Sequence, residues 1–192
     1  MQSTLISDEA LVHQYMQGHE QSFELLIRRH KNKVFTSILM FVRDRYLAED
    51  LFQDTFIKAV RKMRSGEYQE EGKFIPWIMR ISHNLCIDHY RKTRRMPMIT
   101  NEDGIDIFSI LKFSNGNPEK EYLRRESHDI VRMLVDRLPV EQKEVVILRH
   151  WADLSFKEIS DLTGVSINTA LGRMRYALIN IRRMQEEKQV AL

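Results

Sequence analysis

One stretch, residues 154–184, constrains the fold of this chain more than any other. Ser155 followed three residues later by Glu158 forms a capping box, which predicts a helix that begins at the next residue. Gly164 then supplies the backbone conformation of a tight break. Ser166 can cap a second helix directly after it. Two helices joined by so short a turn predict a helix-turn-helix.

The second helix of this unit is expected to have one apolar face and one basic face. Arginines are expected to lie on the polar face, and no Asp or Glu occurs between Leu162 and Gln185. Surface helices usually mix both signs of charge, so an acid-free basic face favours DNA over a plain solvated surface. The residues predicted to form the apolar face are Ile167, Ala170, Met174, Leu178 and Ile181.

The composition is typical of small helical domains. The 192 residues suffice for two of them, and 7 Gly and 4 Pro leave few turn markers. Cys86 is the only cysteine, so no disulfide can form within the chain, which fits a reducing compartment. The polar N-terminus and short apolar runs predict neither a signal peptide nor a membrane span, and we expect a cytoplasmic protein.

Apolar spacing predicts an all-α fold of two small helical domains joined by a linker. We expect an N-terminal domain over residues 1–95 and a C-terminal domain over residues 119–192, the second a four-helix unit that contains the helix-turn-helix. Residues 96–118 combine Asn, Gly and acidic residues with a short apolar patch, which indicates a linker that docks against another surface.

Three segments stand out by composition and order. The first is AEDLFQDTF, residues 48–56, and the second begins FIPWIMRISHN at Phe74 and continues to Arg91 and Lys92. The third runs from Leu138 into the helix-turn-helix. In this order and at these separations they resemble bacterial RNA polymerase sigma factors of the extracytoplasmic-function group, the smallest class, which has only two domains.

The resemblance implies an alternative sigma factor that binds core RNA polymerase. Such a factor directs promoter-specific transcription initiation by recognising the −10 and −35 elements, is not an enzyme, and needs no cofactor or metal. The implied partners are the large subunits of core RNA polymerase, promoter DNA in duplex and single-stranded form, and an anti-sigma protein. No direct insertion into a membrane is expected.

For polymerase binding, the resemblance points to an acidic helix. Asp50, Gln53 and Asp54 lie three and four residues apart and therefore share one face, which is a poor surface for DNA. The resemblance assigns this face, together with Phe56, to the clamp of the polymerase large subunit. Without the resemblance, the same residues would be interpreted as a solvated helix face.

The helix that contains Pro76 in its first turn starts apolar and ends basic. By the resemblance, Asn84 lines a pocket for a flipped base of the −10 element, and its amide offers donors and an acceptor to a base edge. Trp77 offers a stacking platform, but its spacing from Ile81 favours a core position. The residues expected at the −10 element are Arg80, Asn84, Arg91, Lys92, Arg94 and Arg95.

The second helix of the helix-turn-helix is expected to enter the major groove at the −35 element. The resemblance places these residues against DNA: Arg149, Ser166, Asn168, Thr169, Gly172, Arg173, Arg175 and Tyr176. Many relatives carry a basic residue where this chain has Leu171 and a serine where it has Gly172. The −35 sequence therefore cannot be carried over from them.

Two other classes of protein remain as alternatives. An enzyme or metalloprotein would need a motif that is lacking, since His83, Cys86 and His89 share one helix without a clear fourth ligand for zinc. A stand-alone helix-turn-helix regulator is the alternative function. It would footprint a promoter without polymerase, and it would leave the acidic helix unexplained.

Overall fold

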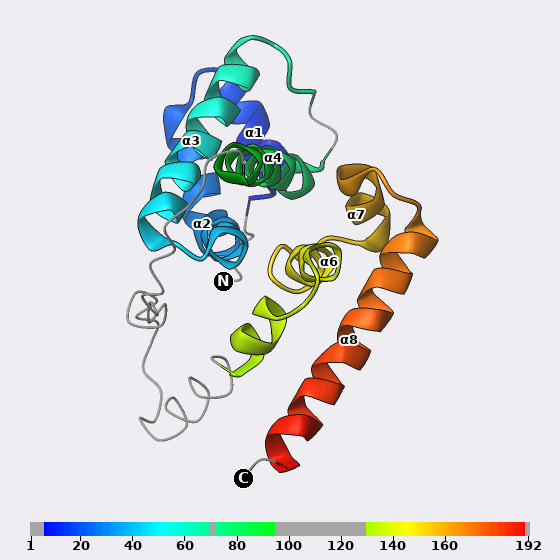
Figure 1. The fold of residues 1–192 in the computed structure, drawn as a ribbon. Coiled ribbons are helices and arrows are strands. Elements are labelled where there is room, and N and C mark those ends of the chain that lie inside the picture. The colour runs from blue at the N-terminus through cyan, green and yellow to red at the C-terminus, as the bar shows by residue number, and fades with distance from the viewer. Residues whose placement is uncertain (1–5, 70–71, 95–129, 191–192) are drawn as a thin grey trace, which may run out of the picture. The chain divides into compact units, whose positions relative to one another are not determined.

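The computed structural model describes residues 6–69, 72–94 and 130–190, and the regular structure within them is helical (Figure 1). The chain divides into two compact units, Met1–Ile99 and Thr100–Leu192. The prediction of an all-α fold with two helical domains is confirmed. The predicted linker, residues 96–118, lies outside the described residues. No helix in the described part of the chain is both long and apolar enough to cross a membrane.

The first unit contains α1 (Asp8–Met16), α2 (Glu20–Val42), α3 (Arg45–Arg64) and α4 (Phe74–Arg94). Two of these helices begin where a side chain caps the first turn. The Ser7 hydroxyl accepts from the Ala10 N–H at 3.2 Å, and the Asp44 carboxylate accepts from the Leu47 N–H at 2.9 Å. Helix α2 packs against α1, α3 and α4, and α3 packs against α4, so α2 forms the centre of this unit.

Aromatic rings fill part of the core between these helices. Phe23 stacks on Tyr15 at 4.7 Å between ring centres and meets the edge of Phe56 at 6.2 Å. Tyr68, in the loop before α4, is buried and lies 4.2 Å from Trp77. Trp77 is half-buried in this contact, in agreement with the core position predicted for it.

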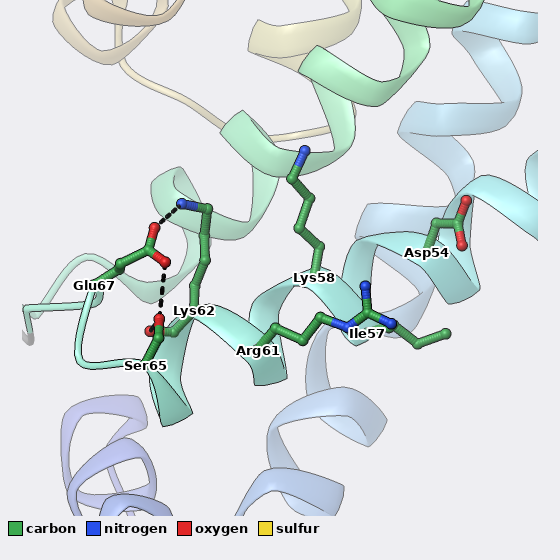
Figure 2. Close-up of a pocket in the computed structure, with 7 residues that line it drawn as sticks. All are labelled: Asp54, Ile57, Lys58, Arg61, Lys62, Ser65 and Glu67. Carbon is green, nitrogen blue, oxygen red and sulfur yellow. Dashed lines mark hydrogen bonds and ion pairs between the residues drawn. The ribbon is translucent and has the colours of Figure 1, made fainter.

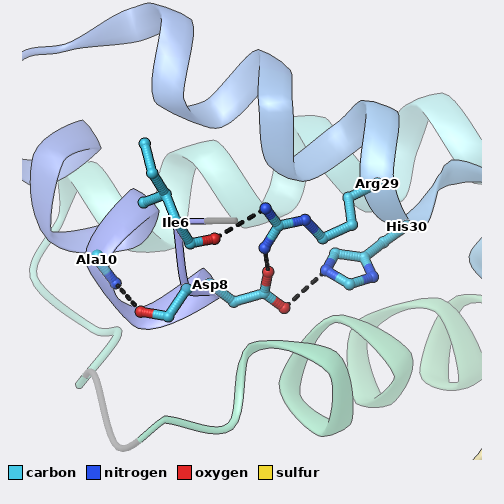
Figure 3. Close-up of polar contacts among 6 residues, drawn as sticks. Ile6, Asp8, Ala10, Arg29 and His30 are labelled. Carbon is cyan, nitrogen blue, oxygen red and sulfur yellow. Dashed lines mark hydrogen bonds and ion pairs between the residues drawn. The ribbon is translucent and has the colours of Figure 1, made fainter. Parts of the chain in front are cut away.

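A polar cluster joins the start of α1 to α2 (Figure 3). One carboxylate oxygen of Asp8 pairs with Arg29, and the other lies 2.7 Å from Nε2 of His30. Arg29 also donates to the backbone carbonyl of Ile6 at 2.8 Å. Burial lowers the pKa of His30, and this effect outweighs the opposing attraction of Asp8. His30 is therefore held mainly neutral in the folded chain near neutral pH.

We expect acid to destabilise the first unit through His30. The pKa of His30 in the folded chain lies below its ordinary value of 6.5. The neutral imidazole therefore stabilises the folded chain above pH 6.5, and this stabilisation is lost as the pH falls through the folded pKa. The urea midpoint of the full chain should drop between about pH 7.5 and 5.5, and His30→Gln should flatten this drop. His13→Gln changes an exposed histidine on α1 and should keep the wild-type pH dependence. An equal drop in wild type, His30→Gln and His13→Gln would show that His30 is not the source of the pH dependence.

The second unit is organised around the predicted helix-turn-helix. Helical residues 130–136 are followed by α6 (Val140–His150), α7 (Phe156–Thr163) and α8 (Ile167–Val190). The capping box is present, because Ser155 accepts from the Glu158 N–H at 3.3 Å and donates its own N–H to the Glu158 carboxylate at 2.7 Å. Gly164 ends α7 with a φ of 71°, and Ser166 caps α8. The helix-turn-helix prediction is confirmed.

The predicted apolar face of α8 is correct only in part. Ala170 and Met174 are buried, but Ile167 and Leu178 are each 43% exposed, and the fully buried Ala177 was not predicted. Helix α8 packs against α6 and α7, and this packing decides which of its faces is covered. The buried face therefore runs through Ala170, Met174 and Ala177, and several apolar residues of α8 are left on the surface.

Candidate polymerase and nucleic-acid interfaces

Helix α3 presents its acidic residues to solvent. Asp50, Gln53 and Asp54 are all exposed, as their spacing predicts, while Leu51 and Thr55 on the opposite face are buried. Among the described residues, no ion pair engages the carboxylates of Asp50 or Asp54. A rigid helix thus carries two unneutralised charges on one exposed face.

Phe56, the fourth residue expected in this surface, lies in the core of the first unit. It is 7% exposed, and its ring meets that of Phe23 on α2 at 6.2 Å between ring centres. In this position the side chain holds α3 against α2 and does not present an aromatic surface to a partner.

The exposed face of α3 continues into a shallow basic hollow (Figure 2). Its lining consists of Asp54, Ile57, Lys58, Arg61, Lys62, Ser65 and Glu67. Glu67 folds back over one of the cations, since its carboxylate lies 2.7 Å from Lys62 Nζ and 2.9 Å from the Ser65 hydroxyl. This contact with Lys62 lowers the pKa of Glu67. Sequence reasoning did not assign the hollow, although Asp54, Lys58 and Arg61 already have helical spacing.

Helix α4 has one buried face and one exposed basic face. Arg80, Asn84, Arg91 and Lys92 are exposed, at intervals that place Arg80, Asn84 and Arg91 along one side of the helix. The opposite side is buried, with Ile78 and Met79 fully inaccessible. The side chain of Arg94 and all of Arg95 lie outside the described residues. The structure therefore brings four of the six expected −10 residues to the surface.

His83 and Cys86 belong to the buried side of α4. His83 packs edge-on against Phe41 at 5.5 Å, and burial raises the pKa of the Cys86 thiol to about 12. A thiol with such a pKa stays protonated and is a poor metal ligand. Within the described ranges, no three His, Cys, Asp or Glu side chains form a group that could hold a metal ion.

Three of the residues expected at the −35 element project from α8 into solvent. Asn168, Arg175 and Tyr176 are exposed, and Tyr176 has 62% of its surface accessible. Ser166 and Thr169 are exposed as well, but their hydroxyl groups lie 2.8 Å apart and take part in the cap of α8. The first turn of α8 is thus rigid and presents polar groups outward.

Two arginines expected to contact DNA are engaged within the second unit. Arg173 is half-buried and lies 3.7 Å from the carboxylate of Glu144 on α6. Arg149 donates to the Leu154 carbonyl at 3.0 Å and lies over the ring of Phe156 at 5.5 Å. These contacts hold the helix-turn-helix against α6, so both arginines have a structural role in addition to any contact with DNA.

Comparison with known proteins identifies the family. The family model "Sigma-70 region 2" matches residues 26–96, and "Sigma-70, region 4" matches residues 128–175. The ECF RNA polymerase sigma-E factor of Haemophilus influenzae is 29% identical over 188 residues, which cover 95% of each protein. This chain belongs to the extracytoplasmic-function (ECF) sigma factors. As a sigma factor, it directs transcription initiation by RNA polymerase, and a stand-alone regulator is not favoured.

Other sigma factors match over nearly the same length. The RNA polymerase sigma-H factor of Pseudomonas aeruginosa is 28% identical over 178 residues, covering 87% of this chain and 88% of that protein. The structure of CnrH in complex with the cytosolic domain of CnrY has a TM-score of 0.68 at 20% identity, covering 95% of this chain and 99% of CnrH. RpoE of Bartonella quintana, solved with the anti-sigma factor NepR, has a TM-score of 0.67 at 18% identity, and the match covers 86% of this chain and 98% of RpoE. The shared fold confirms the helical two-domain architecture.

In this sigma factor, Gly172→Ala is expected to stabilise the free protein and weaken its binding to promoter duplex. An added Cβ meets no atom within 4 Å, so the helix should gain up to about 1 kcal/mol of stability from the better helix former. The same methyl group would stand on the side of α8 that is expected to face DNA. Thermal unfolding and duplex binding by the holoenzyme measure the two effects separately. Unchanged binding would show that DNA does not approach the backbone at this position.

Proposed function

We propose that this sigma factor uses three separate surfaces for initiation. Helix α3 binds core RNA polymerase, α4 holds the −10 element, and α8 recognises the −35 element. The observation that carries the proposal is the division of charge among exposed faces. The face on α3 is acidic, whereas the faces on α4 and α8 are basic and carry Asn84 and Asn168. An acidic face repels DNA and suits a protein partner, and a basic face with amides suits DNA.

The polymerase surface consists of Asp50, Gln53 and Asp54, and Phe56 holds α3 against Phe23 of α2 on the buried side. Two carboxylates four residues apart can form charge-assisted hydrogen bonds with basic side chains of a partner helix in the clamp of the large subunit. Their exposure supports this role, because neither carboxylate is already committed to an ion pair within the described chain. Residues buried behind them keep the face rigid, which reduces the entropic cost of binding.

The −10 surface is a basic helix with one amide in its middle. Arg80, Arg91 and Lys92 attract the phosphates of an opened strand, together with Arg94 and Arg95. Asn84 stands between these cations and can pair with the edge of an unstacked base. Long-range attraction and base reading are thus supplied by different residues of the same helix.

The −35 surface is the exposed side of the first turns of α8. Asn168, Arg175 and Tyr176 have the exposure needed to reach base edges or phosphates, and Ser166 and Thr169 lie at the helix N-terminus, which favours a phosphate. Gly172 permits close approach. Arg149 and Arg173 mainly position the helix-turn-helix, as their contacts with Leu154 and Glu144 indicate.

Regulation by an anti-sigma protein is part of the proposal. CnrH and RpoE were both solved with a partner, and the partner of RpoE is named as an anti-sigma factor. We propose that a protein of this kind covers one or more of the three surfaces and keeps this chain from polymerase. The chain would act in the cytoplasm, where polymerase and promoter lie, with no cofactor and no chemistry of its own.

Transcription by reconstituted holoenzyme tests the proposal. The purified chain is mixed with sigma-free bacterial core polymerase and a library of promoter fragments, and the transcripts are sequenced. We expect discrete start sites that share two upstream motifs. No stimulation, with a folded chain and a compatible core enzyme, would overturn the proposal. A footprint formed by the chain without core would then favour the stand-alone regulator.

A further inference from the structure

Leu171 is an apolar side chain on the exposed face of α8 that the proposed contacts leave without a role. It is 44% exposed and does not belong to the buried face formed by Ala170 and Met174. Asn168 precedes it by three residues and Arg175 follows it by four, so the three side chains neighbour one another on one side of the helix. Exposed apolar side chains are ordinary on a protein surface, and Ile167 and Leu178 of α8 are exposed as well. A leucine between two side chains suited to base edges calls for a more specific explanation.

Gly172 provides a second, independent observation at the same place. An added Cβ would meet no atom within 4 Å, and its φ is not left-handed, so the fold of the free chain does not require glycine there. Glycine nevertheless weakens a helix relative to alanine. What it provides is the absence of a side chain directly beside Leu171. Another surface can therefore approach the helix backbone closely enough for a short apolar side chain to touch it.

The major groove of DNA presents one apolar group to such a side chain, the C5 methyl group of thymine. Against cytosine or guanine, Leu171 would cover polar groups that then lack a hydrogen-bond partner. The neighbours fit the same arrangement, since an Asn amide pairs with adenine and an Arg guanidinium pairs with guanine. We propose that Leu171 reads the methyl group of a thymine in the −35 element, with Gly172 allowing the contact. This inference rests on the proposed −35 role of α8.

Uracil in place of thymine tests the contact, because it removes the methyl group and leaves base pairing intact. Promoters selected by the holoenzyme define the −35 element, and each of its thymines is then replaced by uracil, one at a time. We expect holoenzyme with the wild-type chain to bind one of these duplexes roughly fourfold more weakly, as loss of one buried methyl group implies. Leu171→Ala should bind the thymine duplex more weakly by a similar factor. It should no longer distinguish that thymine from uracil.

The matched control is Leu178→Ala, which truncates a leucine of equal exposure two turns further along α8 and should keep the uracil penalty. Circular dichroism of both variants should show the helical content of the wild-type chain. Equal binding of all uracil duplexes by wild type, or a full penalty retained by Leu171→Ala, would overturn the inference and leave −35 recognition in place. Selected promoters without any shared −35 element would overturn the proposed −35 role of α8 as well as the Leu171 contact. The failure of the contact alone can therefore be distinguished from the failure of −35 recognition.

Discussion

Replacing Asp50 and Asp54 together by lysine is expected to weaken binding to core RNA polymerase by about a hundredfold or more. The exchange converts two attractive contacts with basic residues of the clamp into repulsive ones, and like charges across an interface cost several kcal/mol, where each 1.4 kcal/mol is a factor of ten. Both side chains are exposed, and among the described residues no ion pair depends on them. The fold should therefore survive. Binding of labelled chain to core enzyme at fixed salt measures the effect.

A double exchange elsewhere in the same unit controls for net charge. Glu9→Lys with Glu24→Lys alters the charge by the same amount on α1 and α2, and Glu24 gives up only an exposed pair with Arg28. We expect this protein to bind core enzyme within about threefold of wild type, as expected for charges outside the contact. If both double variants lost binding equally, the loss would come from net charge, and α3 would not be the polymerase surface.

Local features of the sequence predicted the helix ends most accurately. Ser155 and Ser166 each accept a hydrogen bond from a backbone N–H three residues later, and Gly164 takes up the left-handed conformation expected of it. A cap joins groups only a few residues apart, so its formation depends little on the rest of the fold. The exposed acidic face of α3 and the exposed basic face of α4 were predictable for a similar reason, because helical spacing alone sets which residues share a face.

Burial and long-range pairing could not be predicted in the same way. Whether Phe56 faces solvent or the core depends on Phe23 of α2, which approaches it only in the folded unit. Arg173 meets Glu144, a residue of another helix, and no local pattern marks that pair. Leu178 is exposed while the smaller Ala177 is buried, because the packing of α8 on α6 and α7 decides which face of the helix is covered. These differences concern which side chains meet in the folded unit, and they leave the predicted positions of the helices unchanged.

Asn84→Ala is expected to leave polymerase binding intact and to reduce promoter opening by roughly 10- to 100-fold. This range corresponds to the ~1–3 kcal/mol that a side chain pairing with a base edge contributes to discrimination. Alanine is a better helix former than asparagine, and Asn84 is exposed, so the variant should be at least as stable as wild type. A loss of opening could then not be attributed to unfolding. Permanganate reactivity of unpaired thymines at the start site measures the opened fraction.

Gln21→Ala is the matched control, since it also removes an exposed amide from a helix of the first unit but lies on α2. Its open-complex yield should equal that of wild type. Asn84→Asp refines the test, because a carboxylate keeps the size of the amide and loses the donor while adding a charge that repels the strand. We therefore expect Asn84→Asp to open promoters no better than Asn84→Ala. Normal opening by Asn84→Ala would show that the flipped base is held elsewhere on α4, and the basic residues around Asn84 would then act only on the phosphates.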